Sequence, residues 1–575
     1  MKRKKVLKIT AIAIVSPILL FLIIITSLQL YSMYKTHKME EISYETVSPN
    51  YWPTQEWQTS SPEEQGMDSA KLLEMVEDYQ NKHSENEEIF IDSITIIRNG
   101  YIVSDLYFNP LFPKDTSHIL NSCTKSIMAT LIGIAIGEGY IENVDVPVLE
   151  ILNDINIENI DDRLKAMTLK DLLTMETGLH SRDSYIYDWE GLFEMQATDD
   201  WTEHILNLSM ETDPGIRYEY SNMASFLLSA IITKSTGKDT LSFAREYLFD
   251  PLEIKDIRWD KSPKGIYIGW ARMWLKPHDM AKIGLLYLQK GKWEDRQVVP
   301  SWWVEESITA HSFPKQYRYV YDVDGKKDFG TSSGIWISTN LARPLSDGYG
   351  YQWWLDESGI YSAVGYGGQY ITVVPNKNLI VVVTSKMKGE DDFFPVELLK
   401  NYIIPSIVSN EPIPSNEIAQ NKLSSFSVPA SLDVEIKPVQ ELSIIAKEIS
   451  GKTYSLSDSV DSNPWLHDNF RLVFDEDKDY AEFSYTLKKD EVVSYHVGLD
   501  NVYRITETNK GKINEGTYAA IGEWTAPNIF TINYELFGYA TKGRWKLTFN
   551  NNEIMVEETG ITGVYSYGGK KINKD

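Results

Sequence analysis

The sequence predicts an α+β fold, in which helices cover an antiparallel sheet, together with a C-terminal all-β domain and an N-terminal transmembrane helix. Strand-like runs at residues 92–108 and 369–385 flank a region of helical patterns, an order typical of one sheet built from both ends of a domain. From residue 446 onward, short alternating runs separated by turn residues replace the helical period. An uncharged apolar stretch, residues 9–30, precedes both regions.

Bulk composition bounds the class of protein. The 575 residues are 42% hydrophobic and 24% charged, which is typical of a globular protein with room for two domains. A net charge of −26 argues against a nucleic-acid partner, which needs a basic face, and ordinarily serves solubility. The single cysteine excludes an intramolecular disulfide, and the nine scattered histidines form no metal motif. We therefore expect no metal and no cofactor.

The N-terminus predicts a membrane anchor. Residues 9–30, at about 1.5 Å rise each, can span a hydrocarbon core of about 30 Å. Residues 1–8 are strongly basic and form a cytoplasmic stub by the positive-inside rule, which leaves a polar tether, residues 31–60, and the remaining chain extracellular. A signal anchor is favoured over a cleaved signal peptide, because no small-x-small cleavage site and no cysteine for lipidation follow. We expect a single-pass protein of the cell membrane.

Residues 61–410 are expected to form the α+β domain. Ser69 is expected to cap a first helix, and Asn99–Gly100 between two β-rich runs predicts a hairpin. A second hairpin is expected to turn at residues 376–378. Helical patterns cover residues 122–137, 168–175, 221–236, 279–290 and 300–307, and a closing helix is expected over 393–408.

The chain beyond this domain changes in composition. Residues 411–445 are rich in Ser, Pro and Asn and are expected to form a linker. Residues 446–575 contain short alternating runs and predict a separate all-β domain, either a barrel or a sandwich.

Ser122 and Lys125 form a Ser-x-x-Lys motif at the start of a buried helical pattern. The motif recurs at Ser32, Ser235, Ser312 and Ser385, so its context must carry the argument. Here Ser122 would lie at the positive end of the helix dipole with Lys125 one turn along. Lysine can act as the base for a serine nucleophile only when neutral, which requires a pKa roughly three units below its usual value. Alternatively, Ser122 only caps the helix and the Lys125 side chain extends to solvent.

Two further stretches offer the groups that such a reaction needs. Tyr220 and Asn222 open another apolar helix after a Pro-Gly loop, and they present a hydroxyl and an amide on one turn. Gly365, Gly367 and Gly368 remove side chains from a strand edge, where backbone N–H groups could bind an oxyanion. Alternatively, these glycines mark a bulge or a tight bend.

In combination these motifs resemble the serine β-lactamase and penicillin-binding-protein superfamily, in the branch near class C β-lactamases and their esterase and amidase relatives. The resemblance is carried by "SCTKSIMATLIGIAIGEGYI", "MTLKDLLTMETGL", "YEYSN", "WARMWLKPHDMAKIGLLYL", "YGYQWW" and "GYGGQYITVVP". It implies that Ser122 is the acylated nucleophile, that Lys125 and Tyr220 move its proton, and that Asn222 contacts the substrate. It further implies an oxyanion hole made by the backbone N–H groups of Ser122 and Gln369. The C-terminal region is similar to lipocalin-like or sandwich modules.

The third motif departs from the family pattern. Tyr366, Gly367 and Gly368 stand where lactamases and transpeptidases carry Lys-Thr-Gly, so the cation that binds a β-lactam carboxylate is missing. Relatives with this variant resemble esterases, peptidases and amide hydrolases, including those that act on aminohexanoate oligomers. We therefore expect these three residues to bind substrate and β-lactam hydrolysis to be inefficient.

Two functions follow from these observations. The first is a membrane-anchored extracellular serine hydrolase that acts through an acyl-enzyme on a small-molecule or peptide ester or amide. The alternative is a penicillin-binding or wall-ligand-binding sensor with little turnover, although the short stub at residues 1–8 leaves little room for signalling. A Gly-x-Ser-x-Gly match at residues 330–334 lacks the preceding strand and following helix of a nucleophile elbow, so we expect it to be inactive.

Overall fold

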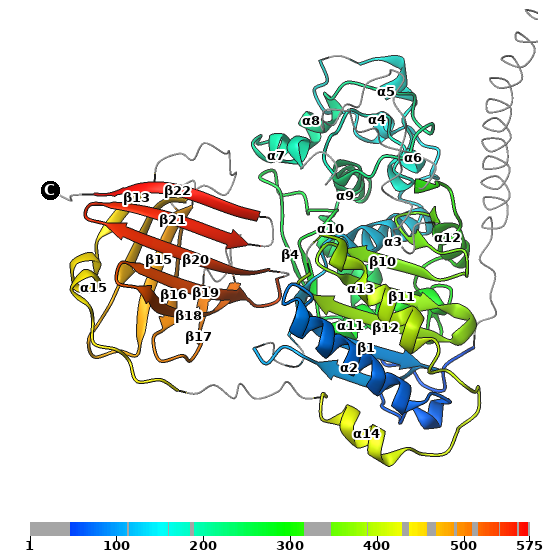
Figure 1. Cartoon of the computed structure of the whole chain (residues 1–575). Coiled ribbons are helices and arrows are strands. Elements are labelled where there is room, and N and C mark those ends of the chain that lie inside the picture. Colours follow the sequence, from blue (N-terminus) through cyan, green and yellow to red (C-terminus); the bar gives the residue numbers. More distant parts are fainter. Residues whose placement is uncertain are drawn as a thin grey trace, which may run out of the picture.

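A computed structural model shows two domains (Figure 1). The structure describes residues 47–111, 114, 116–158, 160–184, 189–314, 347–387, 389–427, 436–456, 467–487, 491–508, 516–539, 541–560 and 563–572. The predicted transmembrane segment, residues 9–30, and the Gly-x-Ser-x-Gly match at 330–334 lie outside these ranges. Among the described helices, none combines the length and the apolar character needed to cross a membrane.

The first domain is built on a seven-stranded antiparallel sheet, which confirms the α+β prediction. Its strand order is β2-β1-β12-β11-β10-β9-β8, so strands from both ends of the domain pair with each other. Both predicted hairpins are present, β1–β2 turning at Asn99–Gly100 and β11–β12 turning at residues 375–378. The strands are β1 (Ile91–Arg98), β2 (Tyr101–Tyr107), β8 (Gly348–Tyr349), β9 (Trp354–Leu355), β10 (Tyr361–Gly365), β11 (Gln369–Val374) and β12 (Leu379–Ser385).

Both faces of this sheet are buried, because alternate residues of each strand enter different cores. Ile380 and Val382 of β12 belong to the core shared with helices α3, α9 and α11, whereas Val381 and Val383 belong to the core shared with α2 and α13. The bounds of these helices are α2 Ser69–Glu85, α3 Cys123–Gly137, α9 Asn222–Thr236, α11 Pro277–Leu288 and α13 Phe394–Leu398. The sheet is therefore the middle layer of three (Figure 1).

The shorter elements form a helical lobe and small strand pairs beside the sheet. The helices are α4 (Val148–Ile151), α5 (Asp162–Ala166), α6 (Leu169–Leu173), α7 (Glu190–Gln196), α8 (Trp201–Leu206), α10 (Thr240–Ala244) and α12 (Ser301–Ser307). A small sheet of order β3-β5-β4 comprises β3 (His118–Ile119), β5 (Met273–Leu275) and β4 (Arg258–Trp259). A two-stranded ladder pairs β6 (Lys292–Trp293) with β7 (Arg296–Gln297).

Most predicted helices are confirmed, with one correction at the start of α2 and one to the closing helix. Asp68 caps α2 by accepting from the backbone N–H of Ala70, and Ser69 is the first helical residue instead of the cap. The expected closing helix over 393–408 is not continuous. It consists of α13 followed by a π-helical turn at Leu399–Ile403, which a 3.6-residue pattern does not distinguish from α-helix.

Two segments expected to be irregular contact the first domain. Within the expected linker, helix α14 (Glu417–Ser424) packs against α2 and β2, because Ala419 and Leu423 give it a buried face. Within the expected tether, Trp57 Nε1 donates to the carbonyl of His278 at 3.0 Å. Composition alone does not predict either contact, because each depends on a few apolar residues among polar ones.

The C-terminal domain is a ten-stranded antiparallel barrel, not a sandwich. The strand order is β16-β15-β14-β13-β22-β21-β20-β19-β18-β17, and a parallel contact between Gly498 and Ile521 closes the sheet on itself. Inward-facing aromatic side chains such as Phe483 and Trp545 fill the interior. The strands are β13 (Thr453–Leu456), β14 (His467–Val473), β15 (Tyr480–Leu487), β16 (Glu491–Gly498), β17 (Arg504–Thr508), β18 (Gly516–Ala526), β19 (Ile529–Leu536), β20 (Thr541–Asn550), β21 (Glu553–Gly560) and β22 (Gly563–Lys571), preceded by helix α15 (Ile444–Ile449).

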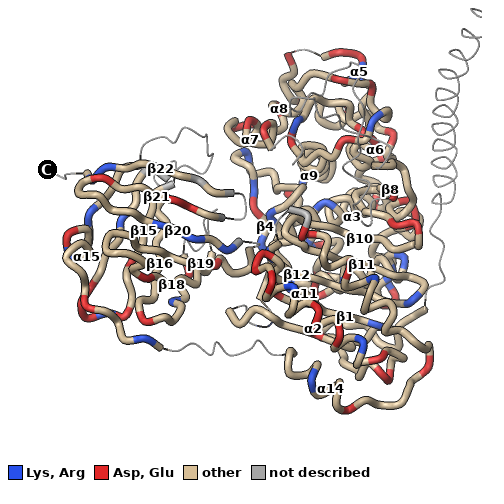
Figure 2. Tube along the Cα trace, viewed as in Figure 1, with Lys and Arg blue, Asp and Glu red and all other residues tan. Residues whose placement is uncertain are grey.

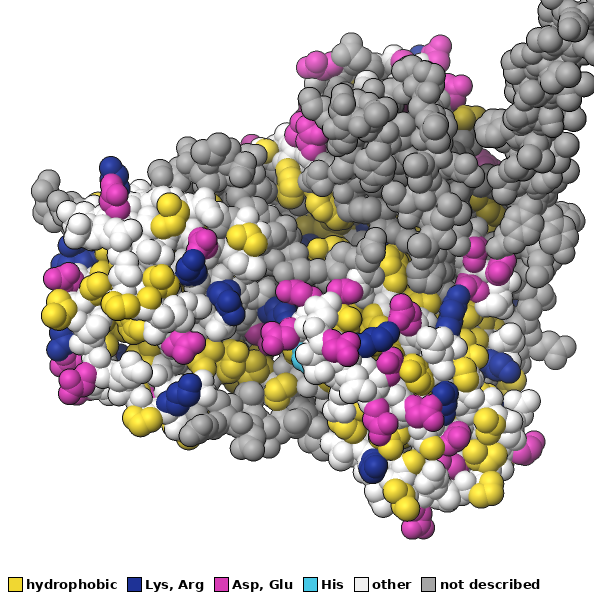
Figure 3. Space-filling model, viewed as in Figure 1, with side chains coloured by type: hydrophobic (Ala, Val, Ile, Leu, Met, Phe, Trp, Pro, Cys, Tyr) yellow, Lys and Arg dark blue, Asp and Glu magenta, His cyan; other side chains and the backbone are white. Residues whose placement is uncertain are grey.

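Charged residues are distributed over both domains. Figure 2 shows acidic and basic residues interspersed along the trace of each domain. Figure 3 shows the same mixture on the molecular face seen in that view, with small apolar patches between the charges. This arrangement is typical of a solvated surface.

Candidate active site

The side chains of Ser122 and Lys125 meet at the start of α3. Ser122 is the N-terminal boundary residue of this helix, but its hydroxyl makes no capping hydrogen bond. Instead, Lys125 Nζ lies 3.0 Å from Ser122 Oγ in a hydrogen bond. Lys125 is only 1% exposed, so its side chain does not extend to solvent. Both parts of the alternative interpretation, a capping serine and a solvated lysine, are therefore wrong.

Burial of Lys125 shifts its protonation equilibrium towards the neutral form. Its Nζ also donates to Asn222 Oδ1 at 2.7 Å and to the carbonyl of Trp270 at 3.1 Å. Burial lowers the pKa of Lys125 to about 7, although the negative charge of Asp183 acts in the opposite direction. A lysine that is half neutral near pH 7 can accept the proton of a neighbouring hydroxyl.

The second motif, Tyr220 and Asn222, lies beside Lys125 at the start of helix α9. Ser221 caps this helix by accepting from the backbone N–H of Ala224 at 3.1 Å, which fixes the residues on either side. The ring centroid of Tyr220 lies 4.7 Å from Lys125 Nζ, and Asn222 holds Lys125 directly. Tyr220 and Asn222 thus belong to one cluster with Lys125.

Asp183 is a buried residue that the sequence did not single out. Its Oδ2 accepts from the backbone N–H of Met223 at 2.6 Å and from Ser221 Oγ at 3.1 Å, and its carbonyl accepts from Asn222 Nδ2 at 2.7 Å. Burial raises the pKa of Asp183. An isolated aspartate in a loop carries no local pattern, so only the folded chain reveals that it orients the start of α9.

The glycine-rich stretch forms the turn between β10 and β11. A Cβ atom at Gly365 would overlap the carbonyl oxygen of Leu120 and would lie 3.1 Å from both Ser122 N and Gln369 Cβ. Gly365 thus allows β10 to pass directly beside the backbone of Ser122. Gly367 adopts a φ of 85°, a conformation that favours glycine. The stretch is a tight turn that also brings two backbone segments together, and its role in binding an oxyanion stays a prediction.

The side chain of Asn121, the residue before Ser122, is hydrogen-bonded to this turn. Its Nδ2 donates to the carbonyl of Tyr366 at 2.6 Å, and its φ of 45° lies in the left-handed region, which asparagine tolerates better than most residues. Tyr366 is 36% exposed, and the following residue, Gly367, donates its N–H to Asp392 Oδ2 at 3.3 Å. Tyr366 thus stands where the resemblance places a lysine, and the backbone N–H of the next residue binds a carboxylate.

The structure brings all the predicted site residues to one place. Ser122, Lys125, Tyr220 and Asn222 cluster by their side chains, and the turn containing Tyr366, Gly367, Gly368 and Gln369 lies against the backbone of Ser122 through Asn121 and Gly365. In the part of the chain that the structure describes, no three His, Cys, Asp or Glu side chains are grouped so that they could hold a metal ion.

Similarity to a known family covers most of the first domain. The family model described as Beta-lactamase matches residues 83–399. The 6-aminohexanoate-dimer hydrolase of Paenarthrobacter ureafaciens is 22% identical over 322 residues, which cover 53% of this chain and 75% of that protein.

Two solved structures with lower identity are also similar. The octameric penicillin-binding protein homologue from Pyrococcus abyssi has a TM-score of 0.41 at 16% identity and covers 87% of this chain and 100% of its own. A penicillin-binding protein homologue from Caulobacter crescentus has a TM-score of 0.41 at 15% identity and covers 58% of this chain and 97% of its own. With the family model covering more than half of its length, the chain belongs to the beta-lactamase family of serine hydrolases.

Proposed function

We propose that this protein is a membrane-anchored, extracellular serine hydrolase that forms an acyl-enzyme on Ser122. The distance of 3.0 Å between Lys125 Nζ and Ser122 Oγ, together with the lysine pKa of about 7, carries the proposal. As Ser122 Oγ bonds to the carbonyl carbon of the substrate, its proton passes to Lys125 Nζ and the carbonyl π electrons move onto oxygen. Collapse of this tetrahedral intermediate expels an alcohol or amine, which receives the proton from Lys125 either directly or through Tyr220.

Water completes the cycle. It attacks the acyl carbon while neutral Lys125 accepts its proton, either directly or by relay through the Tyr220 hydroxyl. The bond to Ser122 Oγ then breaks, and Lys125 returns the proton to Ser122 Oγ as the carboxylic acid leaves. The ring of Tyr220, 4.7 Å from Lys125 Nζ, supports its part in these transfers. Asn222 holds Lys125 through its Oδ1 and is also the residue that we expect to contact the substrate.

The backbone N–H groups of Ser122 and Gln369 are proposed to bind the oxyanion. The close approach of Gly365 to Ser122 N and to Gln369 supports this role, since it sets the two backbone segments side by side. Donors held in place by the fold cost no reorganisation as negative charge develops on the substrate oxygen.

The substrate is proposed to be an ester, amide or peptide without a carboxylate near the reacting carbonyl. Tyr366 offers a hydroxyl and an aromatic face where a lysine would offer a positive charge, and Asp392 adds a negative charge behind Gly367. The similarity to a 6-aminohexanoate-dimer hydrolase supports an amide among the substrates.

The proposed reaction is tested by labelling Ser122. A fluorophosphonate probe followed by peptide mapping is expected to mark the peptide that contains Ser122 and to leave Ser122→Ala unlabelled. Ser235→Ala is the matched control, because Ser235 also begins a Ser-x-x-Lys sequence but lies on α9 outside the cluster. Label retained in Ser122→Ala contradicts the proposal. Label on Ser122 without turnover of any ester, amide, peptide or β-lactam supports the sensor alternative.

The proposed location is tested separately. Protease treatment of intact cells is expected to release both folded domains and to leave a fragment that contains residues 9–30 in the membrane. A secreted protein that begins beyond residue 30 would show cleavage, and protection of the folded domains would contradict the extracellular location.

A further inference from the structure

The C-terminal barrel contacts the first domain at β3, which precedes Ser122 in the chain. The contact is made by the turn between β19 and β20, where the backbone N–H of Ile119 donates to the carbonyl of Gly538 at 2.5 Å. Gly538 has a φ of +67°, and a Cβ there would overlap the carbonyl oxygen of Ser117. The ring of Tyr539 packs edge-on against Trp274, with centroids 4.9 Å apart. The barrel thus binds to the backbone of β3, and β3 is followed three residues later by Ser122.

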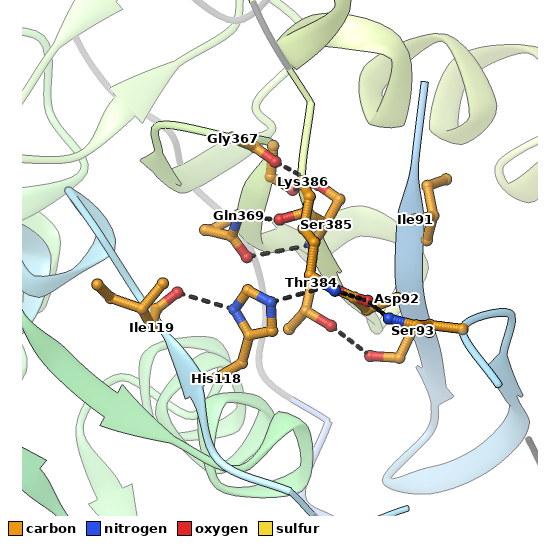
Figure 4. Close-up of polar contacts among 12 residues, drawn as sticks. Ile91, Asp92, Ser93, His118, Ile119, Gly367, Gln369, Thr384, Ser385 and Lys386 are labelled. Carbon is orange, nitrogen blue, oxygen red and sulfur yellow. Dashed lines mark hydrogen bonds and ion pairs between the residues drawn. The ribbon is translucent and has the colours of Figure 1, made fainter. Parts of the chain in front are cut away.

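A buried polar network crosses the same interface. We call it the interdomain network, and it consists of Asp92, Asn109, His118 and Lys386 from the first domain and Glu535 from the barrel. Lys386 Nζ lies 2.9 Å from Asp92 Oδ1 and also forms an ion pair with Glu535. Asn109 donates to Asp92 at 2.6 Å and to Glu535, and His118 Nε2 lies 3.0 Å from Asp92 Oδ2. Figure 4 shows how Asp92, His118 and Lys386 converge.

The charged side chains of the interdomain network stabilise one another in their charged forms. Burial raises the pKa of Asp92, but the charge of Lys386 and the contact with His118 outweigh this effect and hold that pKa at about 2. Burial lowers the pKa of Lys386, but Asp92 and Glu535 raise it above its usual value. A charged lysine that is fully buried requires such partners, and one of them comes from the barrel.

Lys386 connects the network to the turn that contains Gln369. The preceding residue, Ser385, accepts at its carbonyl from Gln369 Nε2 at 2.6 Å and donates its N–H to Gln369 Oε1 at 3.2 Å. Ser385 Oγ donates to the carbonyl of Gly367 at 2.6 Å (Figure 4). The side chain and turn of Gln369 are thus fixed by the residue next to Lys386.

His118 connects the network to the nucleophile. It lies in β3, whose end is followed by Leu120, Asn121 and Ser122, and its Nδ1 lies 3.0 Å from the carbonyl of Ile119. The two backbone segments that the proposed function assigns to the oxyanion hole therefore both lead back to the interdomain network, one through His118 and the other through Lys386.

We propose that Glu535 is a positioning residue of the active site, through which the C-terminal barrel holds the backbone of Ser122 and Gln369 in register for acylation. This inference rests on the proposed function, because it assumes that these two backbone N–H groups bind the oxyanion. Glu535 touches no reacting atom, and its effect passes through Lys386 and Asn109.

Glu535→Gln in the full chain tests the role of the carboxylate. The change leaves the Lys386–Asp92 pair intact but removes the second negative charge. Small displacements of reacting groups cost up to about 100-fold in rate, so we expect acylation per titrated active site to fall about tenfold. The KM for a neutral ester is expected to change less than about twofold. Glu557→Gln is the control, since Glu557 forms an exposed ion pair with Lys546 on the barrel, outside the network.

Gly538→Ala tests the contact between the barrel and the first domain without changing a charged residue. It tests the inference on its own if Glu535→Gln does not fold. Its Cβ forces the turn away from Ser117, so we expect a similar loss of acylation rate per active site. Gly265→Ala is the matched control, because Gly265 also has a positive φ, +83°, but nothing lies within 4 Å of an added Cβ.

The acylation rate per folded active site separates a positioning effect on the active site from a loss of folded protein. Burst titration with the fluorophosphonate counts folded sites, and the rate is expressed per site. Wild-type rates per site in Glu535→Gln and Gly538→Ala would overturn the inference, even if fewer sites were folded. Rates lowered equally in the control variants would overturn it as well. Persistent labelling of Ser122→Ala would instead refute the proposed function itself.

Discussion

The pH dependence of acylation tests the role of Lys125. An ordinary lysine has a pKa of 10.5, whereas burial lowers that of Lys125 to about 7. At pH 7 about half of the Lys125 side chains are then neutral, compared with about 3 in 10,000 for an ordinary lysine. This difference corresponds to about 5 kcal/mol in the free energy of protonation. The fold therefore increases the neutral base at pH 7 by roughly three orders of magnitude.

The assay measures kcat/KM for a neutral ester and the rate of fluorophosphonate labelling across the pH range. Because neutral Lys125 is the active form, both rates are expected to rise about tenfold per pH unit below about pH 7 and to level off above it. A profile that is flat through this region, or one that keeps rising to the pKa of an ordinary lysine, would refute the assignment of Lys125 as the base.

Asp183→Asn supplies the matching perturbation. The negative charge of Asp183 raises the pKa of Lys125 against the effect of burial. Removal of this charge is therefore expected to lower the pKa of Lys125. The rising part of the pH–rate profile is then expected to move to lower pH by about one unit, a typical effect of one nearby charge. Asp356→Asn is the control, because Asp356 is also a buried carboxylate but pairs with Lys400. A rising part that moves to higher pH in Asp183→Asn would contradict the electrostatic argument.

Three further variants test the remaining parts of the site. Tyr220→Phe removes a proton carrier and is expected to lower kcat at least about 100-fold, measured on the same ester, whereas an unchanged kcat would exclude Tyr220 from proton transfer. Tyr366→Lys restores a cation near the turn and is expected to shift the ratio of penicillin to ester turnover about tenfold towards penicillin; an unchanged ratio would contradict the substrate argument. Gly365→Val places carbon atoms against the carbonyl of Leu120 and is expected to lower labelling of Ser122 about 100-fold in folded protein, and wild-type labelling would show that the close approach is dispensable.

Local patterns in the sequence predicted most of the first domain. The Asn99–Gly100 turn and the apolar periods of α3, α9 and α11 depend on neighbours within one or two turns, so they can be read without the fold. The order of Ser-x-x-Lys, Tyr-x-Asn and the glycine-rich turn also lies within the sequence. These signals named the catalytic candidates around Ser122, but they did not single out Asn121, Asp183 or Trp270, which contact residues of the site.

The tertiary structure decided what depends on distant contacts. Whether the C-terminal strands close into a barrel depends on the contact between Gly498 and Ile521, which no alternating pattern reveals. The pKa of Lys125 depends on how completely other elements exclude water from it, and the part played by Asp183 depends on the arrival of α9.

The interdomain network illustrates this division most clearly. Asp92 and Lys386 are 294 residues apart in the chain, and Asn109 and Glu535 are 426 residues apart. Each of these residues, taken in its local sequence, is an ordinary polar residue within a strand or next to one. A polar side chain becomes part of a buried network only when folding removes its water and supplies a partner, and the position of that partner is a property of the whole fold.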